Sequence, residues 1–335
     1  MNVMLLAAGE GTRLRPYTLI RPKPAIPFLN IPLASYPLAF LEDLKIDRLI
    51  VNTFHLPTKV VDLFIHMNHG ARKLHFSHEI TQILDTGGGL GAARDYFKPA
   101  EDLILMNSDE VILPTEKGVV AKAIELHQKN KALCTLLTME HEGVGTKFGG
   151  VWLDSKDRVR GFGKTAPGAE CVKAEHFIGI QILSGKIFDY LPNGTPANIL
   201  YDAVTKGIQE GHLVQRYKVP CHWYETGNAQ DFLKATASCL DILKSKTETY
   251  EQSHLRRALE RFSQEAPVLE TVGSATVLRT ASTKIESGVT LKGFGVFGSQ
   301  AQVLAGSNLE NVVVADKIKV AANTAATDLI FLENN

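Results

Sequence analysis

Short apolar runs alternate with amphipathic stretches along the first half of the chain. Two of the amphipathic stretches follow Ser35 and Thr115, and each of these hydroxyls is a plausible N-cap for a helix. Strands that alternate with helices predict an α/β fold, in which a mostly parallel sheet is covered by helices on both faces. The runs expected to form its strands lie at 3–7, 48–54, 73–79, 102–108 and 132–139.

The pattern changes near residue 148, where residues 148–162 alternate apolar and polar positions around a turn, as in a β-hairpin. The sequence then predicts one strand and two helices, at 176–184, 197–211 and 228–246. The charged run His254–Phe262 is expected to be the solvent-exposed face of a linker helix. We therefore expect three parts: a first domain at 1–240, a helical linker at 241–268 and a C-terminal domain at 269–335.

The C-terminal part has a different period. Apolar residues recur there every six positions, amid small, Gly- and Val-rich sequence, and this spacing is typical of a parallel β-helix, in which each flat side stacks one apolar side chain on the next. An ordinary small β-domain with accidental spacing is the alternative. The recurring positions are Ile285, Leu291, Phe297, Val303, Leu309 and Ala315.

Composition narrows the class of partner and the compartment. Lys and Arg number 36, as do Asp and Glu, so the formal net charge is zero. A binder of nucleic acid or of a membrane surface has a basic excess, so we expect neither partner. No apolar run approaches the roughly 18 residues of a membrane span, and the first residues do not resemble a signal peptide. The four cysteines are far apart in the sequence, so we expect free thiols, which are typical of a reducing compartment. We therefore expect a cytoplasmic protein.

The segment after the first predicted strand is rich in glycine, cations and proline. Gly9 and Gly11 suit a turn whose backbone N–H groups face phosphate oxygens. The segment lacks the P-loop pattern, and Leu14 stands where the dinucleotide fingerprint requires a third glycine. Arg13 and Lys23 supply full positive charge. These features favour a bound nucleotide polyphosphate over the alternative, a basic surface loop.

The motifs Gly-x-Gly-Thr-Arg-Leu-x-Pro, from Gly9, and Pro-Lys-Pro-x-x-Pro, from Pro22, resemble those of the sugar-1-phosphate nucleotidylyltransferases. The resemblance continues through 51–57, 77–93, 107–112 and 223–232, and so covers about residues 1–235. It implies an enzyme with a Rossmann-like nucleotidyltransferase sheet that joins an NTP and a sugar 1-phosphate and releases pyrophosphate. A C-terminal left-handed β-helix also occurs in some members, notably mannose-1-phosphate guanylyltransferases, where such domains often mediate self-association.

The resemblance also assigns nucleotide-binding and catalytic positions. Arg13, Lys23 and Asp109 are the catalytic candidates, with Lys23 directed toward the α-phosphate. The base and ribose are expected at Leu6, Ala8 and Gly9, and the β- and γ-phosphates at Gly11, Thr12 and Arg13. Further nucleotide contacts are expected from Glu79, Gly87, Gly88 and Asn107, of which the two glycines form a wall beside the base.

A divalent cation, Mg²⁺, is implied by the reaction, and its expected ligands are Asp109 and Glu225. Asp109 directly follows a predicted strand; its alternative role is that of a turn or N-cap residue, and Glu110 is the less favoured ligand. The family usually has aspartate in a Trp-x-Asp-x-Gly context, whereas this chain has Glu225. The additional methylene keeps the charge but moves the oxygens by about one C–C bond length.

The sugar phosphate is expected at Gly149, Lys164 and Gly179. Two departures from the family lie here: Phe162-Gly163-Lys164-Thr165 replaces a common Glu-Lys-Pro, and Phe177-Ile178-Gly179 replaces Asn-Ala-Gly.

Three functions follow from the resemblance. The first is synthesis of an NDP-sugar for cell-envelope polysaccharide from GTP and mannose 1-phosphate. The second uses UTP and an amino-sugar 1-phosphate such as N-acetylmuramate 1-phosphate, because residues 84–90 resemble a Thr-Gly-Gly-Gly loop of such enzymes. The third is a non-catalytic nucleotide-sugar-binding regulator, suggested by Glu225 and the altered sugar loop.

Overall fold

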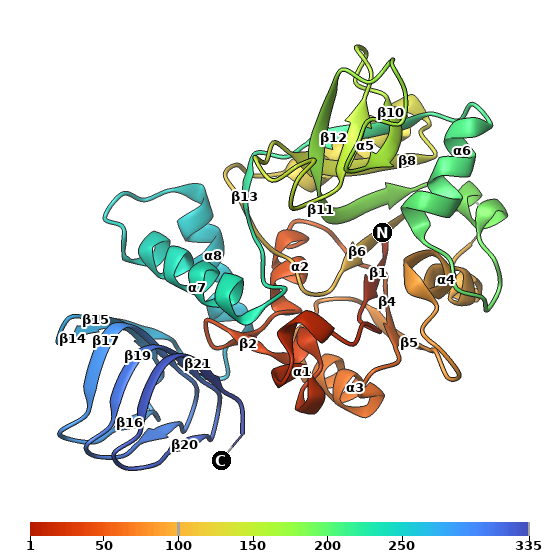
Figure 1. Cartoon of the computed structure of the whole chain (residues 1–335). Coiled ribbons are helices and arrows are strands. Elements are labelled where there is room, and N and C mark those ends of the chain that lie inside the picture. The colour runs from red at the N-terminus through yellow and green to blue at the C-terminus, as the bar shows by residue number, and fades with distance from the viewer. Residues whose placement is uncertain (99–100, 334–335) are drawn as a thin grey trace.

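A central mixed sheet organises the first two-thirds of the molecule in the computed structural model, which describes residues 1–98 and 101–333. Strands β6, β1, β4 and β5 are parallel neighbours, and β12 runs parallel to β8 (Figure 1). The sheet strands in spatial order are β10 (Val159–Gly163), β9 (Gly150–Leu153), β11 (Lys173–Leu183), β6 (Leu103–Asn107), β1 (Asn2–Leu6), β4 (Arg48–Thr53) and β5 (Lys73–His78), with β8 (Cys134–Met139) between β11 and β12 (Val214–Lys218). The five strands expected in the first half are all present.

Helices cover both faces of this sheet. Alternate residues of each strand point to opposite sides, and on both sides they are apolar and need to be covered. Val3 and Leu5 belong to one buried cluster, and Met4 belongs to another. The first cluster includes residues of α2 (Ser35–Phe40), α3 (Pro57–His66) and α5 (Val119–Asn130). The second includes residues of α4 (Asp85–Ala92), η4 (Gly185–Tyr190) and η5 (Ile199–Val204), which α6 (Thr205–Gln209) continues. The expected two-sided layering is confirmed.

Strand β11 departs from the parallel arrangement. It runs antiparallel to β6, β8 and β9, and the expected hairpin forms as β9 and β10. A separate antiparallel ribbon of β7 (Val111–Pro114) and β13 (Cys221–Tyr224) connects the end of β6 to the segment before α7 (Ala229–Lys244). This ribbon brings residues after 107 close to residues after 224.

Both N-cap expectations are wrong. Helix α2 begins at Ser35 itself, whose buried hydroxyl has no hydrogen-bond partner within residues 1–98 and 101–333. Helix α5 begins only at Val119, after Gly118 at φ +75°, because β7 extends the chain as far as Pro114. None of the helices within the described ranges combines the length and hydropathy needed to cross a membrane.

The C-terminal region consists of stacked strands. One sheet contains β14 (Val268–Val272), β15 (Ala275–Arg279), β17 (Thr290–Phe297), β19 (Asn308–Val314) and β21 (Ala325–Phe331). The other contains β16 (Lys284–Ile285), β18 (Gln302–Val303) and β20 (Lys319–Val320). All neighbours are parallel except β14 and β15.

The register of these strands agrees with the six-residue period. Thr290 lies beside Asn308, and Lys284 lies beside Gln302, so these partners are eighteen positions apart. In the last turn the spacing is seventeen, because Gln302 lies beside Lys319 and Asn308 beside Ala325. Most of the recurring apolar positions are buried. A continuous left-handed β-helix stays a prediction, and positions 334 and 335 of the expected domain lie outside the described residues.

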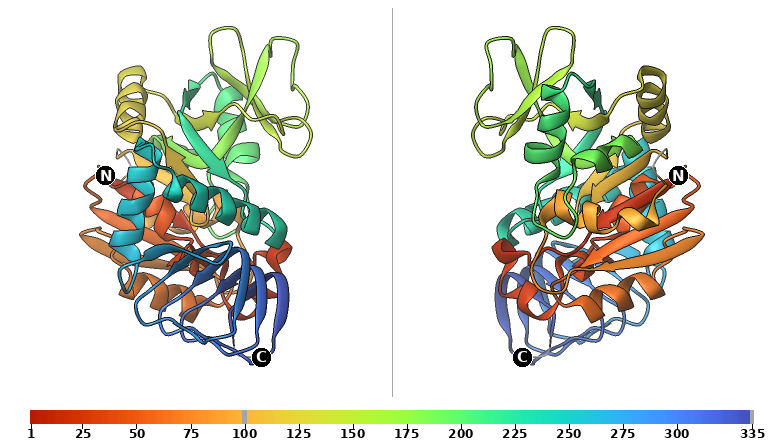
Figure 2. Two further views of the ribbon diagram at one scale, coloured as in Figure 1. Left: turned by 90° about the vertical axis from the view of Figure 1, so that its left-hand side faces the viewer. Right: turned by 90° about the vertical axis from the view of Figure 1, so that its right-hand side faces the viewer.

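Helices α7 and α8 (Tyr250–Phe262) join the first part of the chain to the C-terminal strands. Helix α7 crosses the expected boundary at 240, and α8 packs against α2 and β7. The expectation of a solvent-exposed face at 254–262 is wrong in part, because His254 is buried and Arg257 Nη2 lies 2.6 Å from Glu42 Oε1. The blue C-terminal strands lie beside the red N-terminal segment in both views of Figure 2.

Candidate active site

The turn after β1 is shaped by glycine. Gly11 has φ +62°, and a Cβ there would lie 2.8 Å from Thr18 Cγ2. The Thr18 hydroxyl donates a hydrogen bond to the Gly11 carbonyl at 2.9 Å, which holds the turn closed. A side chain at position 11 would therefore be strained and would push against Thr18. The turn is followed by η1 (Thr12–Leu14) and α1 (Tyr17–Ile20).

Lys23 and Asp109 form a direct ion pair at the carboxyl edge of the sheet. Lys23 Nζ lies 2.6 Å from Asp109 Oδ2, and the two side chains are only 12% and 27% exposed. Lys23 begins the short helix η2 (Lys23–Ala25), after Pro22 in an extended conformation. Asp109 follows β6, whose Asn107 is in register with Leu6 of β1. Parallel strands end at the same edge of a sheet, so both loops meet there.

A cavity of about 220 Å³ opens at this edge. Eight of the expected site residues line it: Leu6, Ala8, Gly9, Gly11, Lys23, Glu79, Asn107 and Asp109. Sequence reasoning missed several further lining residues, namely Ala7, Pro24, Asn52, Ile83, Asp85, Thr86 and Ser108. Asn52 could have been noticed, because it is a polar residue within an apolar strand run. The position of Asp85 depends on how the loop before α4 folds back, which no local pattern indicates.

Glu79 supports the wall of this cavity. Its Oε1 accepts a hydrogen bond from Asn52 Nδ2, and its Oε2 accepts one from the Leu84 N–H, both at 2.7 Å. The amide oxygen of Asn52 in turn accepts from the Ala7 N–H at 2.7 Å. Burial raises the pKa of Glu79, although these hydrogen bonds oppose the shift. Both carboxylate oxygens are thus engaged in holding the 79–84 loop against β1 and β4.

Gly87 and Gly88 do not line the cavity. They lie inside α4, and both of their N–H groups donate to the Ala197 carbonyl, at 2.7 and 3.0 Å. A Cβ on Gly88 would lie 2.3 Å from the Thr195 carbonyl oxygen. These glycines allow close packing of α4 on the 195–199 segment, and the residues that face the cavity are the two preceding ones.

Arg13 and Glu225 form a second pair on neighbouring loops. Arg13 Nη1 lies 3.7 Å from Glu225 Oε1, which also accepts a hydrogen bond from the Gly227 N–H at 2.7 Å. The Thr226 hydroxyl donates to the Asp109 carbonyl at 3.1 Å, so this loop abuts the loop that carries Asp109. Thr12, Arg13 and Glu225 are outside the cavity lining, and the Arg13 side chain is 68% exposed.

Glu110 is partly buried and both of its carboxylate oxygens are engaged by neighbouring side chains. Its carboxylate accepts hydrogen bonds from Asn107 Nδ2 at 2.8 Å and from Trp223 Nε1 at 2.7 Å. Burial raises the pKa of Glu110 well above its usual range, and the charge of Asp109 raises it further. Gly179, at φ +80°, packs here, since a Cβ on it would lie 2.7 Å from the Glu110 side chain.

The expected sugar-phosphate residues fall into two places. Gly149 lies close to Gly163, which immediately precedes the exposed Lys164, whereas Gly179 lies beside Glu110. The rings of His141, Phe148, His176 and Trp223 form an aromatic cluster, in which the ring centroids of His176 and Trp223 are 4.3 Å apart. Neither ring nitrogen of the buried His176 has a hydrogen-bond partner among the residues that the structure describes. Burial and the neighbouring His141 lower the pKa of His176 to about 4.

Comparisons with known proteins agree with this architecture. A UTP–glucose-1-phosphate uridylyltransferase from Synechocystis is 23% identical over 99% of this chain and 87% of its own length. A mannose-1-phosphate guanylyltransferase from Mycobacterium tuberculosis is 23% identical over 96% of this chain and 82% of its own.

Two solved structures have a similar fold. UDP-glucose pyrophosphorylase from Acinetobacter baumanii gives a TM-score of 0.62 at 16% identity, over 77% of this chain and 98% of its own. HddC from Yersinia pseudotuberculosis complexed with GMP-PN gives a TM-score of 0.56 at 23% identity, over 71% of this chain and 98% of its own. The pattern of the nucleotidyl transferase family matches residues 2–242, and the chain therefore belongs to that family of enzymes.

Proposed function

We propose that this enzyme joins GTP and a sugar 1-phosphate, mannose 1-phosphate in the first instance, to give a GDP-sugar and pyrophosphate. The sugar-phosphate oxygen attacks the α-phosphorus of GTP, a new P–O bond forms, and the bond to the β-phosphate oxygen breaks. Two anions must meet in this reaction, so neutralising and aligning charge accounts for most of the catalysis. The observation that carries the proposal is the cavity in which Lys23 and Asp109 meet at 2.6 Å.

Lys23 is the cation that meets the phosphates. Asp109 pairs with its ammonium, and a bound triphosphate would offer that ammonium a second anionic partner. The backbone of 9–11 closes the same end of the cavity and supplies neutral donors. Arg13 lies further out, where its exposed guanidinium can reach the leaving pyrophosphate.

Asp109 and Glu225 suit Mg²⁺. Among the described residues no hydrogen bond is donated to Asp109 Oδ1 or Glu225 Oε2, and the two carboxylates come from abutting loops. Mg²⁺ in phosphate chemistry uses one or two protein carboxylates plus phosphate oxygens, so a larger cluster of protein ligands is unnecessary. When bound, the ion adds positive charge where negative charge develops on the phosphates.

The base end of the cavity favours guanine. Ile83 is 40% exposed and lines the cavity, so it offers an apolar surface for a flat base. Asp85 lines the same cavity with an exposed carboxylate. Guanine presents two adjacent donors, N1–H and N2–H₂, which a carboxylate accepts together, whereas uracil presents a single N–H between two carbonyl oxygens.

The sugar phosphate approaches from the side of Gly149, Lys164 and Gly179. Lys164 is exposed and has no ion pair or hydrogen bond among the described residues, so its charge is free for the sugar's phosphate. This subsite has two halves. In one, Gly149 lies against the backbone of Gly163, and in the other, Gly179 lies against the side chain of Glu110.

Pyrophosphate release across a panel of NTPs and sugar phosphates tests the proposal. We expect turnover with GTP and mannose 1-phosphate. Turnover with UTP, and with glucose 1-phosphate or an amino-sugar 1-phosphate, would reject the guanine assignment. Nucleotide-sugar binding without turnover at any Mg²⁺ concentration would support a regulator instead.

The base assignment has its own variant. Asp85→Asn is expected to weaken use of GTP by about 10-fold while leaving UTP unchanged, since each good base contact is worth about 1–3 kcal/mol. Asp95→Asn, an exposed aspartate outside the cavity, is the matched control.

A further inference from the structure

A tight hairpin follows Lys23 in the chain. Strands β2 (Pro27–Phe28) and β3 (Ile31–Pro32) pair, and the two residues at its tip, Leu29 and Asn30, have φ +50° and +68°. The left-handed conformation costs an L-residue about 1–2 kcal/mol, and a bulky leucine adopts it only when the surroundings impose it. Something outside the hairpin therefore stabilises this tip.

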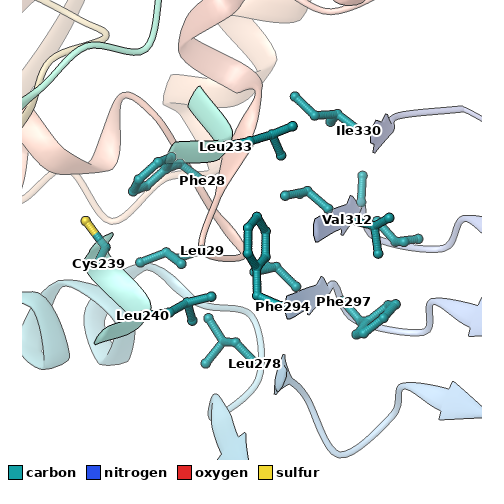
Figure 3. Close-up of a cluster of buried hydrophobic side chains, with 14 of the residues drawn as sticks. Phe28, Leu29, Leu233, Cys239, Leu240, Leu278, Phe294, Phe297, Val312 and Ile330 are labelled. Atoms are coloured by element: carbon teal, nitrogen blue, oxygen red, sulfur yellow. The ribbon is translucent and has the colours of Figure 1, made fainter. Parts of the chain in front are cut away.

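The C-terminal strands hold the tip. Leu29 is fully buried in one hydrophobic cluster with Phe294, Phe297 and Val312 (Figure 3). Asn30 Nδ2 donates a hydrogen bond of 2.8 Å to the Phe297 carbonyl. The hydrogen bond joins residues 267 positions apart, and with the shared hydrophobic cluster it places the tip against β17 and β19.

The chain is held on the other side of Lys23 as well. Arg21 Nη2 donates to the Leu332 carbonyl at 3.4 Å. Burial lowers the pKa of Arg21, and the charges of Asp316 and Glu333 oppose that shift. Arg21 and Asn30 thus anchor the segment to the C-terminal region, and Lys23 lies two residues after the first anchor and seven residues before the second.

The base of the hairpin transmits this position to the lysine. The Ala34 N–H donates to the Pro24 carbonyl at 3.0 Å, and the Leu33 N–H donates to the Ile26 carbonyl at 3.0 Å. Phe28 packs edge-on against Phe232 of α7, with ring centroids 5.2 Å apart. Since α7 follows Glu225, the same packing links the hairpin to the loop of the second carboxylate.

We propose that the C-terminal strands position Lys23 for the reaction by holding the 21–34 segment at Arg21 and Asn30. This inference rests on the proposed role of Lys23 at the triphosphate. The two anchors are positioning residues: neither lines the cavity, and each acts through the lysine between them. The C-terminal strands therefore act on the reaction only through the 21–34 segment that they hold.

The test uses Asn30→Gly in the full chain. Glycine adopts the tip conformation without strain and removes only the amide, so the fold is expected to remain. We expect kcat to fall about 10-fold or more, because a displacement of about 1 Å can cost 10²-fold. The amides of Leu33 and Ala34 should also exchange with solvent faster.

Asn311→Gly is the matched control. Asn311 also has a positive φ, +51°, and donates through Nδ2, at 2.9 Å to Asp328, but it is outside the hairpin contacts. We expect its kcat and the exchange of the hairpin amides to stay at the wild-type value. Arg21→Met provides a second variant, should Asn30→Gly fail to fold, and is expected to lower kcat in the same way.

The outcomes separate the inference from the proposed function. A folded Asn30→Gly or Arg21→Met protein with wild-type kcat overturns the inference, and a lowered Tm with unchanged kcat below the unfolding range does so too. Lys23→Ala is measured alongside. If it retains full turnover, the proposed role of Lys23 fails; if it loses turnover while the anchor variants do not, only the positioning inference fails.

Discussion

Asp109→Asn separates the charge at the phosphate end of the cavity from its shape. The substitution keeps the size of the side chain and removes its negative charge. The Asp109 carbonyl, which accepts a hydrogen bond from the Thr226 hydroxyl, is unaffected, so the loop contact to 225–227 is expected to persist. What is lost is the ion pair with Lys23 at 2.6 Å and one proposed metal ligand.

The two expected effects differ in kind. Lys23 and Asp109 are only 12% and 27% exposed, so their pair lies between the exposed case, worth about 0–1 kcal/mol, and the buried case, in which loss of one partner costs about 3–5 kcal/mol. We therefore expect the unfolding free energy to fall by about 1–3 kcal/mol. Loss of a single preorganised electrostatic contact in a transition state costs about 10²–10³ in kcat, or about 2.7–4 kcal/mol. We expect kcat to fall at least that far in protein that is still folded at the assay temperature.

A continuous assay of pyrophosphate release at saturating substrate concentrations measures kcat, and thermal unfolding measures the change in stability. Asp43→Asn is the control, because Asp43 pairs with Lys117 at 3.9 Å on the surface, away from the cavity. Turnover within about threefold of wild type in folded Asp109→Asn would refute the reasoning and remove Asp109 from the metal site.

The remaining predictions concern three other glutamates. Glu225→Asp should keep or raise kcat, because it retains the charge and restores the usual family side chain; loss of turnover would mean that the longer side chain is required. Glu79→Ala should lower the unfolding free energy by about 2–5 kcal/mol in urea titration, because two buried donors lose their acceptors, and a loss below about 1 kcal/mol would contradict this. For Glu42, burial alone would raise the pKa, but His254 and Arg257 outweigh it and lower the pKa to about 2. The difference in unfolding free energy between the wild type and Glu42→Gln is therefore expected to be largest above pH 4.5 and to shrink as the pH falls toward 2. A difference that does not change with pH would exclude a stabilising ion pair.

The sequence indicated the class of the fold because hydrophobic period is a local signal. The strands that end at Leu6 and Asn107 were expected from their apolar runs, and the chemistry of their following loops pointed to Lys23 and Asp109. The structure brings these two side chains into one ion pair. Motif spacing and parallel-strand geometry were sufficient for this much.

Contacts between distant segments could not be predicted in the same way. Gly87 and Gly88 were expected to form a wall beside the base, yet they pack inside a helix against residues about 110 positions away. The charged helix α8 suggested a solvated face, yet its residues contact α2. A local pattern shows which face is apolar or charged, but the partner that covers it is set by tertiary packing.

A crystal structure with a non-hydrolysable GTP analogue and Mg²⁺ tests the central claim most directly. We expect density for the triphosphate over the 9–11 turn, with the Lys23 ammonium against its phosphates and the metal on the Asp109 carboxylate. Nucleotide bound elsewhere, with Lys23 and Asp109 still paired as they are now, would contradict the account.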